Sequence, residues 1–314
     1  MTNQAAIEIR GLSHSYGTRT ALQDVSFQVA RGTIFGLLGP NGGGKTTLFR
    51  ILSTLLRPQT GTVQILGDDV AKSPHQIRRR IGVVFQAQSV DRQLTLLENL
   101  RHQGHLYGFR GKALRKRAEA MLARLGLADR KNDRAETLSG GLRRRLELAK
   151  GLLHQPEVLL LDEPSTGLDA SARRDLRLYL SQLREEFGVT ILLTTHFMNE
   201  AEACDCLGIL DRGRLVALDS PAALKETIGG DVLVLGTREP ETLSRRIQER
   251  FGGDPKIVGG MVRLERPQAH VFVTDLVEAF PGQIDSVTLS KPTLEDVFIQ
   301  RTGHQFWHGT QESK

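Results

Sequence analysis

The sequence predicts an α/β protein in which a mostly parallel sheet is covered by helices on both faces, followed by a small α+β domain. Apolar runs of strand length, such as VLLLDE at 158–163 and VTILLTT at 189–195, alternate with stretches of helical spacing, such as 171–187. Strand-like segments, beginning with AIEIRGL at 6–12, open the chain. The order of elements changes after residue 229, which indicates the second domain.

The composition is that of a folded chain. A length of 314 residues suggests about two domains. The net charge is +6 and 39% of the residues are hydrophobic, which excludes an intrinsically disordered chain. The longest apolar runs are strand-sized, well below the ~18–20 residues of a membrane span, and the first ten residues lack the pattern of a secretory signal. Cys204 and Cys206 are too close for a useful disulfide, which indicates a reducing compartment.

Helical spacing dominates the middle of the chain. Residues 95–127 carry apolar side chains at three- and four-residue intervals, and a further helix continues through Leu153. The segment RRIGVVFQ at 79–86 predicts a strand before this region, and another strand follows it. We therefore expect a helical lobe at about 87–153, inserted in the sheet of a domain that spans 1–228.

The second domain, 229–302, has the predicted order β-α-β-β-α-β, which matches the ferredoxin-like arrangement. Its central hairpin is expected to turn at Gly259-Gly260. Its last helix, PTLEDVFIQRTG, is expected to start with Pro292 and a Thr293 cap. Residues 303–314 are expected to form a frayed tail.

A glycine-rich run between a predicted strand and a predicted helix is the strongest motif, because GPNGGGKT at 39–46 satisfies the pattern G-x-x-x-x-G-K-[ST]. Glycines let successive N–H groups point at phosphate oxygens, and the helix adds the positive end of its dipole. Lys45 is expected to reach the β- and γ-phosphates, and the Thr46 hydroxyl to bind Mg²⁺. A purely structural turn is the alternative. The predicted ATP-binding residues here are Gly39, Pro40, Asn41, Gly42, Gly43, Gly44, Lys45, Thr46 and Thr47.

Two acidic residues follow the apolar run at 158–161. Such a run predicts a buried parallel strand, and α/β sheets bind ligands at the carboxyl ends of their strands. Asp162 is expected to hold Mg²⁺ through water, and Glu163 to orient or deprotonate the attacking water. The alternative is an acidic pair that caps the chain ahead of Pro164. Together with the phosphate motif, the pair predicts a Mg²⁺-dependent nucleoside triphosphatase.

A further motif, LSGG at 138–141, precedes that strand. Six motifs follow one another along the chain: the glycine-rich run, GVVFQ ending at Gln86, LSGG, LLLDEP at 159–164, STGLD at 165–169, and Thr195-His196. In this order they resemble the ATP-binding cassette (ABC) ATPases over roughly residues 5–225. The resemblance implies a P-loop cassette fold with an N-terminal antiparallel β segment. The resemblance implies that Gln86 contacts Mg²⁺ and the attacking water, and that His196 contacts the γ-phosphate. It also implies that Tyr16 stacks on adenine. An ordinary edge-strand tyrosine is the alternative reading of Tyr16.

The resemblance also implies a dimer. In this family the LSGG loop of one subunit caps the γ-phosphate bound by the other subunit, so that two cassettes enclose two ATP molecules. A helix N-terminus with free N–H groups is suited to this contact. Ser139, Gly140 and Gly141 would contact the partner's ATP, and Asp169 would lie in the loop that crosses the interface. The expected partner is a second copy of the chain or a related cassette.

The residues after LSGG depart from the usual pattern, because Leu142 replaces glutamine and Arg143–Arg145 follow. These residues, together with the segment PTLEDVFIQRTG near the C-terminus, resemble daunorubicin/doxorubicin-resistance-type subunits. The resemblance implies ATP-driven export of a hydrophobic or amphiphilic compound through a separate membrane permease of about six helices. The chain itself would bind this permease at the cytoplasmic face of the membrane. Apolar residues near 94–100 would dock the permease, and no nucleic acid is expected. The alternative is a soluble ABC ATPase that acts on ribosomes or DNA.

Overall fold

A computed structural model describes residues 5–306 of the chain. The chain divides into two compact units, Met1–Leu215 and Val216–Lys314, and each is described by itself. Most of the tail predicted at 303–314 lies outside the described residues. None of the described helices has the length and apolar character needed to cross a membrane.

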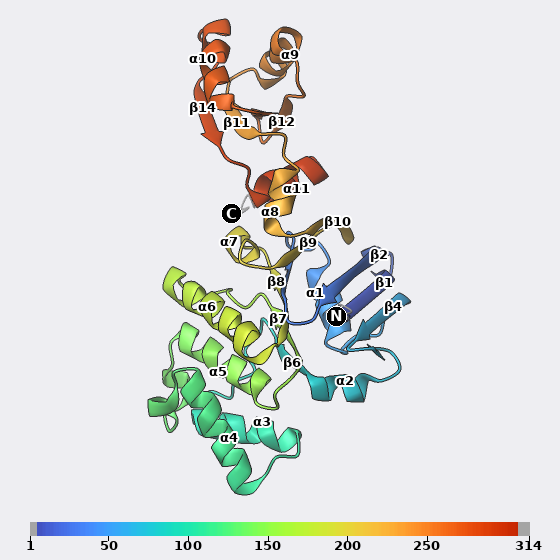
Figure 1. The fold of residues 1–314 in the computed structure, drawn as a ribbon, viewed down its shortest axis with the longest axis vertical. Coiled ribbons are helices and arrows are strands. Elements are labelled where there is room, and N and C mark those ends of the chain that lie inside the picture. The colour runs from blue at the N-terminus through green and yellow to red at the C-terminus, as the bar shows by residue number, and fades with distance from the viewer. Residues whose placement is uncertain (1–4, 307–314) are drawn as a thin grey trace. The chain divides into compact units, whose positions relative to one another are not determined.

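Unit 1 is built on two sheets (Figure 1). Its strands are β1 (Ala5–Tyr16), β2 (Arg19–Ala30), β3 (Ile34–Leu38), β4 (Thr60–Ile65), β5 (Asp68–Asp69), β6 (Ile81–Val84), β7 (Val158–Asp162), β8 (Thr190–Thr195) and β9 (Cys206–Asp211). A tenth strand, β10 (Arg214–Asp219), begins in unit 1 and continues past Leu215. One sheet is antiparallel, in the order β2-β1-β4-β5. The other has the order β10-β9-β3-β8-β7-β6, and its strands from β9 to β6 run parallel. This mixed core and the antiparallel N-terminal sheet agree with the predicted class.

Helices connect these strands. They are α1 (Lys45–Leu52), α2 (Pro74–Arg80), α3 (Leu96–Leu106), α4 (Gly111–Arg124), α5 (Gly140–Leu152), α6 (Ala170–Phe187) and α7 (Met198–Ala201), with single 3₁₀ turns at Ala128–Arg130 and Ala135–Thr137. The helices α3, α4 and α5 lie between β6 and β7 in the sequence and form a helical lobe. Thr95 caps α3 with a capping box that includes Glu98, which fixes where this lobe's first helix begins.

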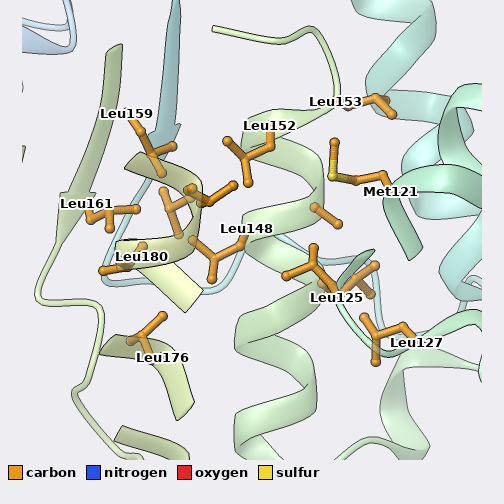
Figure 2. Close-up of a cluster of buried hydrophobic side chains, with 14 of the residues drawn as sticks. Met121, Leu125, Leu127, Leu148, Leu152, Leu153, Leu159, Leu161, Leu176 and Leu180 are labelled. Carbon is orange, nitrogen blue, oxygen red and sulfur yellow. The ribbon is translucent and has the colours of Figure 1, made fainter. Parts of the chain in front are cut away.

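The strand β7 shows why the core sequence is continuously apolar. All five of its residues are buried, and alternate side chains enter different hydrophobic clusters. Val158 and Leu160 pack with α1 and the antiparallel sheet, whereas Leu159 and Leu161 pack with α5, α6 and the helical lobe. A parallel strand covered on both faces needs no polar positions. Figure 2 shows the second cluster, which includes Leu148, Leu152, Leu176 and Leu180.

Unit 2 contains a single antiparallel sheet in the order β12-β13-β11-β14. Its elements are α8 (Pro221–Glu226), β11 (Asp231–Gly236), α9 (Pro240–Phe251), β12 (Lys256–Val258), β13 (Met261–Arg266), α10 (Ala269–Ala279), β14 (Ser286–Ser290) and α11 (Leu294–Thr302). The hairpin between β12 and β13 turns at Gly259 and Gly260, as predicted, and both glycines have positive φ. Arg263 of β13 forms a buried ion pair with Asp296 of α11.

The structure corrects two predicted starting residues and divides the central helical tract. The strand predicted at 79–86 begins only at Ile81, because α2 occupies the residues before it. The helical tract at 95–127 is two helices, separated near Gly108, whose φ of +82° lies in the region that glycine adopts without strain. The predicted Thr293 cap of the last helix is confirmed and forms a capping box with Asp296, so the helix itself begins at Leu294 and not at Pro292.

The cluster in Figure 2 predicts the effect of a core substitution. Leu148 is fully buried, so Leu148→Ala leaves a cavity and is expected to lower the free energy of unfolding by about 2–5 kcal/mol. Leu106→Ala, at a position that is 82% exposed in the same lobe, is expected to change it by less than about 0.5 kcal/mol. Urea denaturation of the two variants beside the parent chain measures both values. Equal losses would contradict the assigned core.

Candidate active site

The loop from β3 to α1 needs glycine at two positions for different reasons. A Cβ atom on Gly39 would lie 2.3 Å from the carbonyl oxygen of Leu210 in the neighbouring strand. Gly44 has a φ of +107°, and a Cβ there would lie 2.6 Å from the carbonyl oxygen of Ala21. The first glycine therefore allows a close approach of two backbones, and the second allows the turn into the N-terminus of α1.

Lys45 is the buried cation of this loop, with a residue exposure of only 4%. Its Nζ donates to the carbonyl oxygens of Gly39 at 2.7 Å and Pro40 at 3.1 Å, and lies 3.6 Å from Oε1 of Glu163. Burial lowers the pKa of Lys45, and the Glu163 carboxylate opposes that shift. A polyphosphate offers this ammonium stronger partners than two neutral carbonyls do.

A cavity of about 330 Å³ lies beside the loop, within the range of ligand pockets. Tyr16, the last residue of β1, lines it with a 46% exposed side chain. Thr46 and Thr47, in the first turn of α1, line it as well, Thr46 exposed and Thr47 buried. Glu163 also borders this cavity, which brings one of the acidic residues after β7 to the phosphate motif.

Two hydrogen bonds through the Thr194 hydroxyl join the carboxyl ends of β7 and β8, and we refer to them as the relay. Asp162 and Thr194 are register partners in the sheet, and the Thr194 hydroxyl donates to Oδ1 of Asp162 at 2.6 Å. The same hydroxyl accepts from the backbone N–H of Glu163 at 3.0 Å. Burial raises the pKa of Asp162, and the Thr194 hydrogen bond, which favours the charged carboxylate, opposes this shift.

Glu163 has an unusual backbone conformation, with a φ of +43°. The left-handed region costs a non-glycine residue roughly 1–2 kcal/mol, so the surrounding contacts must hold it there. The backbone hydrogen bond to Thr194 is one of these contacts. Because the chain turns sharply at this residue, the Glu163 side chain leaves the strand direction and reaches the groups around the phosphate motif.

Three further segments bring side chains to Oε2 of Glu163. Gln86, two residues after β6, donates its Nε2 at 3.2 Å. His196, directly after β8, places its Nδ1 at 3.2 Å, and Thr166 donates its hydroxyl at 3.2 Å. Lys45 lies near the other carboxylate oxygen, Oε1, so the Glu163 carboxylate contacts side chains from four separate segments. The structure brings together the predicted residues Lys45, Gln86, Glu163 and His196.

The LSGG segment lies elsewhere in the unit. Ser139 caps α5, its hydroxyl accepting from the N–H of Leu142 at 3.4 Å, and Asp169 caps α6, accepting from the N–H of Ala172 at 2.8 Å. Ser139, Gly141 and Asp169 line a second cavity of about 570 Å³. Among residues 5–306, none lines both this cavity and the one beside the phosphate motif. Within one chain, the predicted residues therefore form two separate groups.

Two residues near Glu163 were not predicted as part of the site. Thr194 joins Asp162 to the Glu163 backbone, and its signal was a pair of polar residues ending an otherwise apolar strand. Arg144 is buried and donates to backbone carbonyls on both sides of Glu163. Its signal was a charged residue four positions before the buried Leu148, on the inward face of α5.

The model of the ABC transporter family matches residues 22–166 of the chain. Over nearly its whole length the chain is also similar to named relatives. It is 38% identical to the daunorubicin resistance ATP-binding protein DrrA3 of Streptomyces coeruleorubidus, over 95% of this chain and 96% of the relative. It is 39% identical to the Nod factor export ATP-binding protein I of Ralstonia nicotianae, over 95% of this chain and 94% of the relative.

A solved structure adds a similar fold with a nucleotide. The dimeric post-hydrolysis state of an ATP-binding cassette, bound to ADP and Pi, is 28% identical, with a TM-score of 0.61, and covers 68% of this chain and 98% of its own. The chain belongs to the ABC transporter family. It is an ATP-binding subunit similar over nearly its whole length to the resistance and export proteins above, and its activity is that of an ABC ATPase.

The relay at Thr194 predicts a shift in pH dependence. Thr194→Val removes the hydrogen bond that favours the charged form of Asp162, so the pKa of Asp162 is expected to rise further. The acidic limb of the pH profile of ATP hydrolysis should move to higher pH, and kcat near neutrality should fall by about tenfold. Thr194→Ser keeps the hydroxyl and should retain the parent profile. An unchanged profile for the valine variant would contradict the relay.

Proposed function

We propose that Glu163 activates the water that attacks the γ-phosphate of ATP. The observation that carries this proposal is the contact of its carboxylate with Lys45, Gln86 and His196 at the mouth of the phosphate loop. A carboxylate so placed can accept a proton from water while Gln86 and His196 hold the water and the γ-phosphate in line. Lys45 and the N–H groups of the loop at 39–46 would bind the phosphates, and Tyr16 would stack on the adenine.

Magnesium suits the oxygen atoms available at this site. We propose that the Thr46 hydroxyl, the Gln86 amide oxygen and the Asp162 carboxylate hold it, the last through water, because Mg²⁺ prefers hard oxygen ligands and keeps several waters. The buried Asp162 carboxylate supports this assignment, since the hydrogen bond that it accepts from the Thr194 hydroxyl comes from a neutral group. When bound, the ion neutralises charge that develops on the phosphates.

The active unit proposed here is a dimer. Ser139, Gly140 and Gly141 stand at the start of a helix whose free N–H groups suit a phosphate, yet in one chain Ser139 and Gly141 border a different cavity from Lys45. A head-to-tail pair of cassettes would bring each group of one chain to the complementary group of the other. Asp169, at the start of α6, would lie at that interface. The partner is a second copy of this chain or a related cassette.

The proposed role of the dimer is to drive export through a separate membrane permease. The relatives are named for daunorubicin resistance and Nod factor export, which supports a hydrophobic or amphiphilic cargo and disfavours a soluble ATPase of ribosomes or DNA. We place the chain at the cytoplasmic face of the membrane, held by the permease. The helical lobe at 87–153 would dock it near residues 94–100.

We also propose a domain division for the chain. The cassette domain would span 1–228, and 229–302 would form a separate ferredoxin-like domain. The order β-α-β-β-α-β and the antiparallel strand order β12-β13-β11-β14 support the ferredoxin-like assignment.

The role of Glu163 predicts a separation of binding from turnover. Glu163→Gln keeps the size and the hydrogen-bonding oxygen of the side chain but removes the base, so ATP hydrolysis should fall by at least about a hundredfold. ATP affinity should stay within about threefold, and the ATP-bound dimer should persist on a sizing column. Lys45→Ala is the matched contrast, because it should weaken nucleotide binding itself. Undiminished hydrolysis by the glutamine variant would refute the assignment.

The dimer proposal predicts an effect at a distance from the phosphate loop. Ser139→Arg places a bulky cation at the start of α5, where the partner's phosphate would lie, and should abolish ATP hydrolysis. Nucleotide binding to the monomer, measured by calorimetry with the hydrolysis-deficient chain, should be unchanged because Ser139 borders a different cavity. If the arginine variant hydrolyses ATP at the parent rate, the cross-dimer arrangement is wrong.

A further inference from the structure

The helix α5 carries a buried arginine that touches three loops of the site. Arg144 is 8% exposed, and its guanidinium donates to three backbone carbonyls. Nη1 donates to Phe85 at 2.8 Å, Nη2 to Asp162 at 3.2 Å, and Nε to Pro164 at 2.9 Å. These carbonyls belong to the residue before Gln86 and to the two residues that flank Glu163. One side chain of α5 therefore fixes the backbone on which both of these groups stand.

The next inward-facing charges of α5 hold the other end of the Gln86 loop. Glu147 is 3% exposed and accepts from the N–H groups of Ser89 at 2.6 Å and Val90 at 2.8 Å, and from the Ser89 hydroxyl at 2.7 Å. Lys150, one turn further, donates to the carbonyl oxygen of Ser89 at 2.5 Å. Arg144, Glu147 and Lys150 recur at three-residue intervals and share one face of the helix. We refer to these three residues as the α5 clamp.

The clamp leaves little freedom to the segment that carries Gln86. Phe85 is held by Arg144, and Ser89 is held by Glu147 and Lys150, so only residues 86–88 lie between the two attachments. The helix that makes these attachments begins at the cap Ser139. A displacement of α5 must therefore carry the Gln86 loop with it. Arg144, through Asp162 and Pro164, is at the same time a link from this helix to the end of β7.

The three arginines after LSGG have different partners, so the contacts of Arg144 are not shared by every basic residue of this segment. Arg143 donates to the carbonyl oxygen of Leu138 at 2.7 Å, and Arg145 pairs with Asp175 at 2.8 Å. Only Arg144 reaches the loops around Glu163. A planar guanidinium offers donors in several fixed directions, which the point charge of lysine does not.

We propose that the α5 clamp positions Gln86 for hydrolysis and transmits a movement of the LSGG helix to it. Arg144 and Glu147 are positioning residues in this proposal, because neither is required to touch ATP. The inference rests on the proposed roles of Gln86 and Glu163. It predicts that loss of the clamp lowers kcat while ATP binding, which uses the loop at 39–46, is retained.

A double-mutant cycle tests the clamp in the full-length chain. Glu147→Ala should lower kcat by about 10–100-fold, since it removes several hydrogen bonds to a charged group, and should leave KM for ATP within about threefold. In the Gln86→Ala background the same change should cost less than about twofold, because a residue that acts through Gln86 has no further effect once Gln86 is gone. Glu147→Gln keeps the accepting oxygen and should restore part of kcat.

Two further variants complete the design. Glu119→Ala removes a glutamate of the same lobe that pairs with Arg115 and Lys131 but does not contact the Gln86 loop, and it should leave kcat unchanged. Arg144→Lys should lower kcat by about tenfold with KM unchanged, and faster hydrogen exchange in the peptide that contains residues 85–90 should accompany the loss. This variant keeps the charge, so it carries the test if Glu147→Ala does not fold.

The outcomes separate the clamp from the site on which it rests. Full additivity of Glu147→Ala and Gln86→Ala, or parent kcat in both Glu147→Ala and Arg144→Lys, overturns the clamp. If Glu147→Ala does not fold, the double-mutant cycle is made with Arg144→Lys and Gln86→Ala instead. If Arg144→Lys then lowers kcat as much in the Gln86→Ala background as in the parent chain, the link to Gln86 is overturned. If Gln86→Ala and Glu163→Gln themselves leave kcat unchanged, the proposed roles of Gln86 and Glu163 are wrong, and the clamp has no site to position.

Discussion

Negative charge at the end of a buried strand is the constraint around which the cassette is arranged. The strand β7 is apolar from Val158 to Leu161, ends in the buried Asp162 and is followed by Glu163. A carboxylate removed from water needs partners, and these come from the phosphate loop, from β8 and from the loops after β6 and β8. The strained backbone of Glu163 is consistent with a position fixed by its surroundings. ATP would enter a site whose charges are already compensated, with Lys45 released from carbonyls to phosphates.

The same need for partners extends behind the site. Arg144 is a buried cation satisfied by carbonyl oxygens, and Glu147 is a buried anion satisfied by N–H groups and a hydroxyl. Burial lowers the pKa of Arg144, and the negative charge of Glu147 is the leading opposing influence. Because buried charges tolerate little displacement of their partners, this network makes the helical lobe and the Gln86 loop move together. Such a connection gives the LSGG helix an effect on hydrolysis beyond its own contact.

Most of the fold could be predicted because its signals are local. The apolar run at 158–161 forms β7, and the glycine-rich turn lies between β3 and α1. The helical spacing at 95–127 also forms helices, which the structure divides near Gly108 into α3 and α4. The supporting contacts of the site were harder to predict from the sequence. Those of Thr194 and Arg144 join residues more than 15 positions apart, and they depend on strand register and on the rotation of α5 about its axis. The spacing to Leu148 indicates that Arg144 faces inward, but it does not indicate which carbonyl oxygens the guanidinium contacts.

The central claim is that a complete hydrolytic site needs the phosphate loop of one chain and the LSGG turn of another. Co-expression of a Lys45→Ala chain with a Ser139→Arg chain, carrying different affinity tags, allows purification of the mixed dimer. One site of this dimer would combine an intact phosphate loop from one chain with an intact Ser139 from the other, while each homodimer would have none. The account predicts ATP hydrolysis by the mixed dimer well above that of either homodimer. A mixed dimer as inactive as the two homodimers would contradict it.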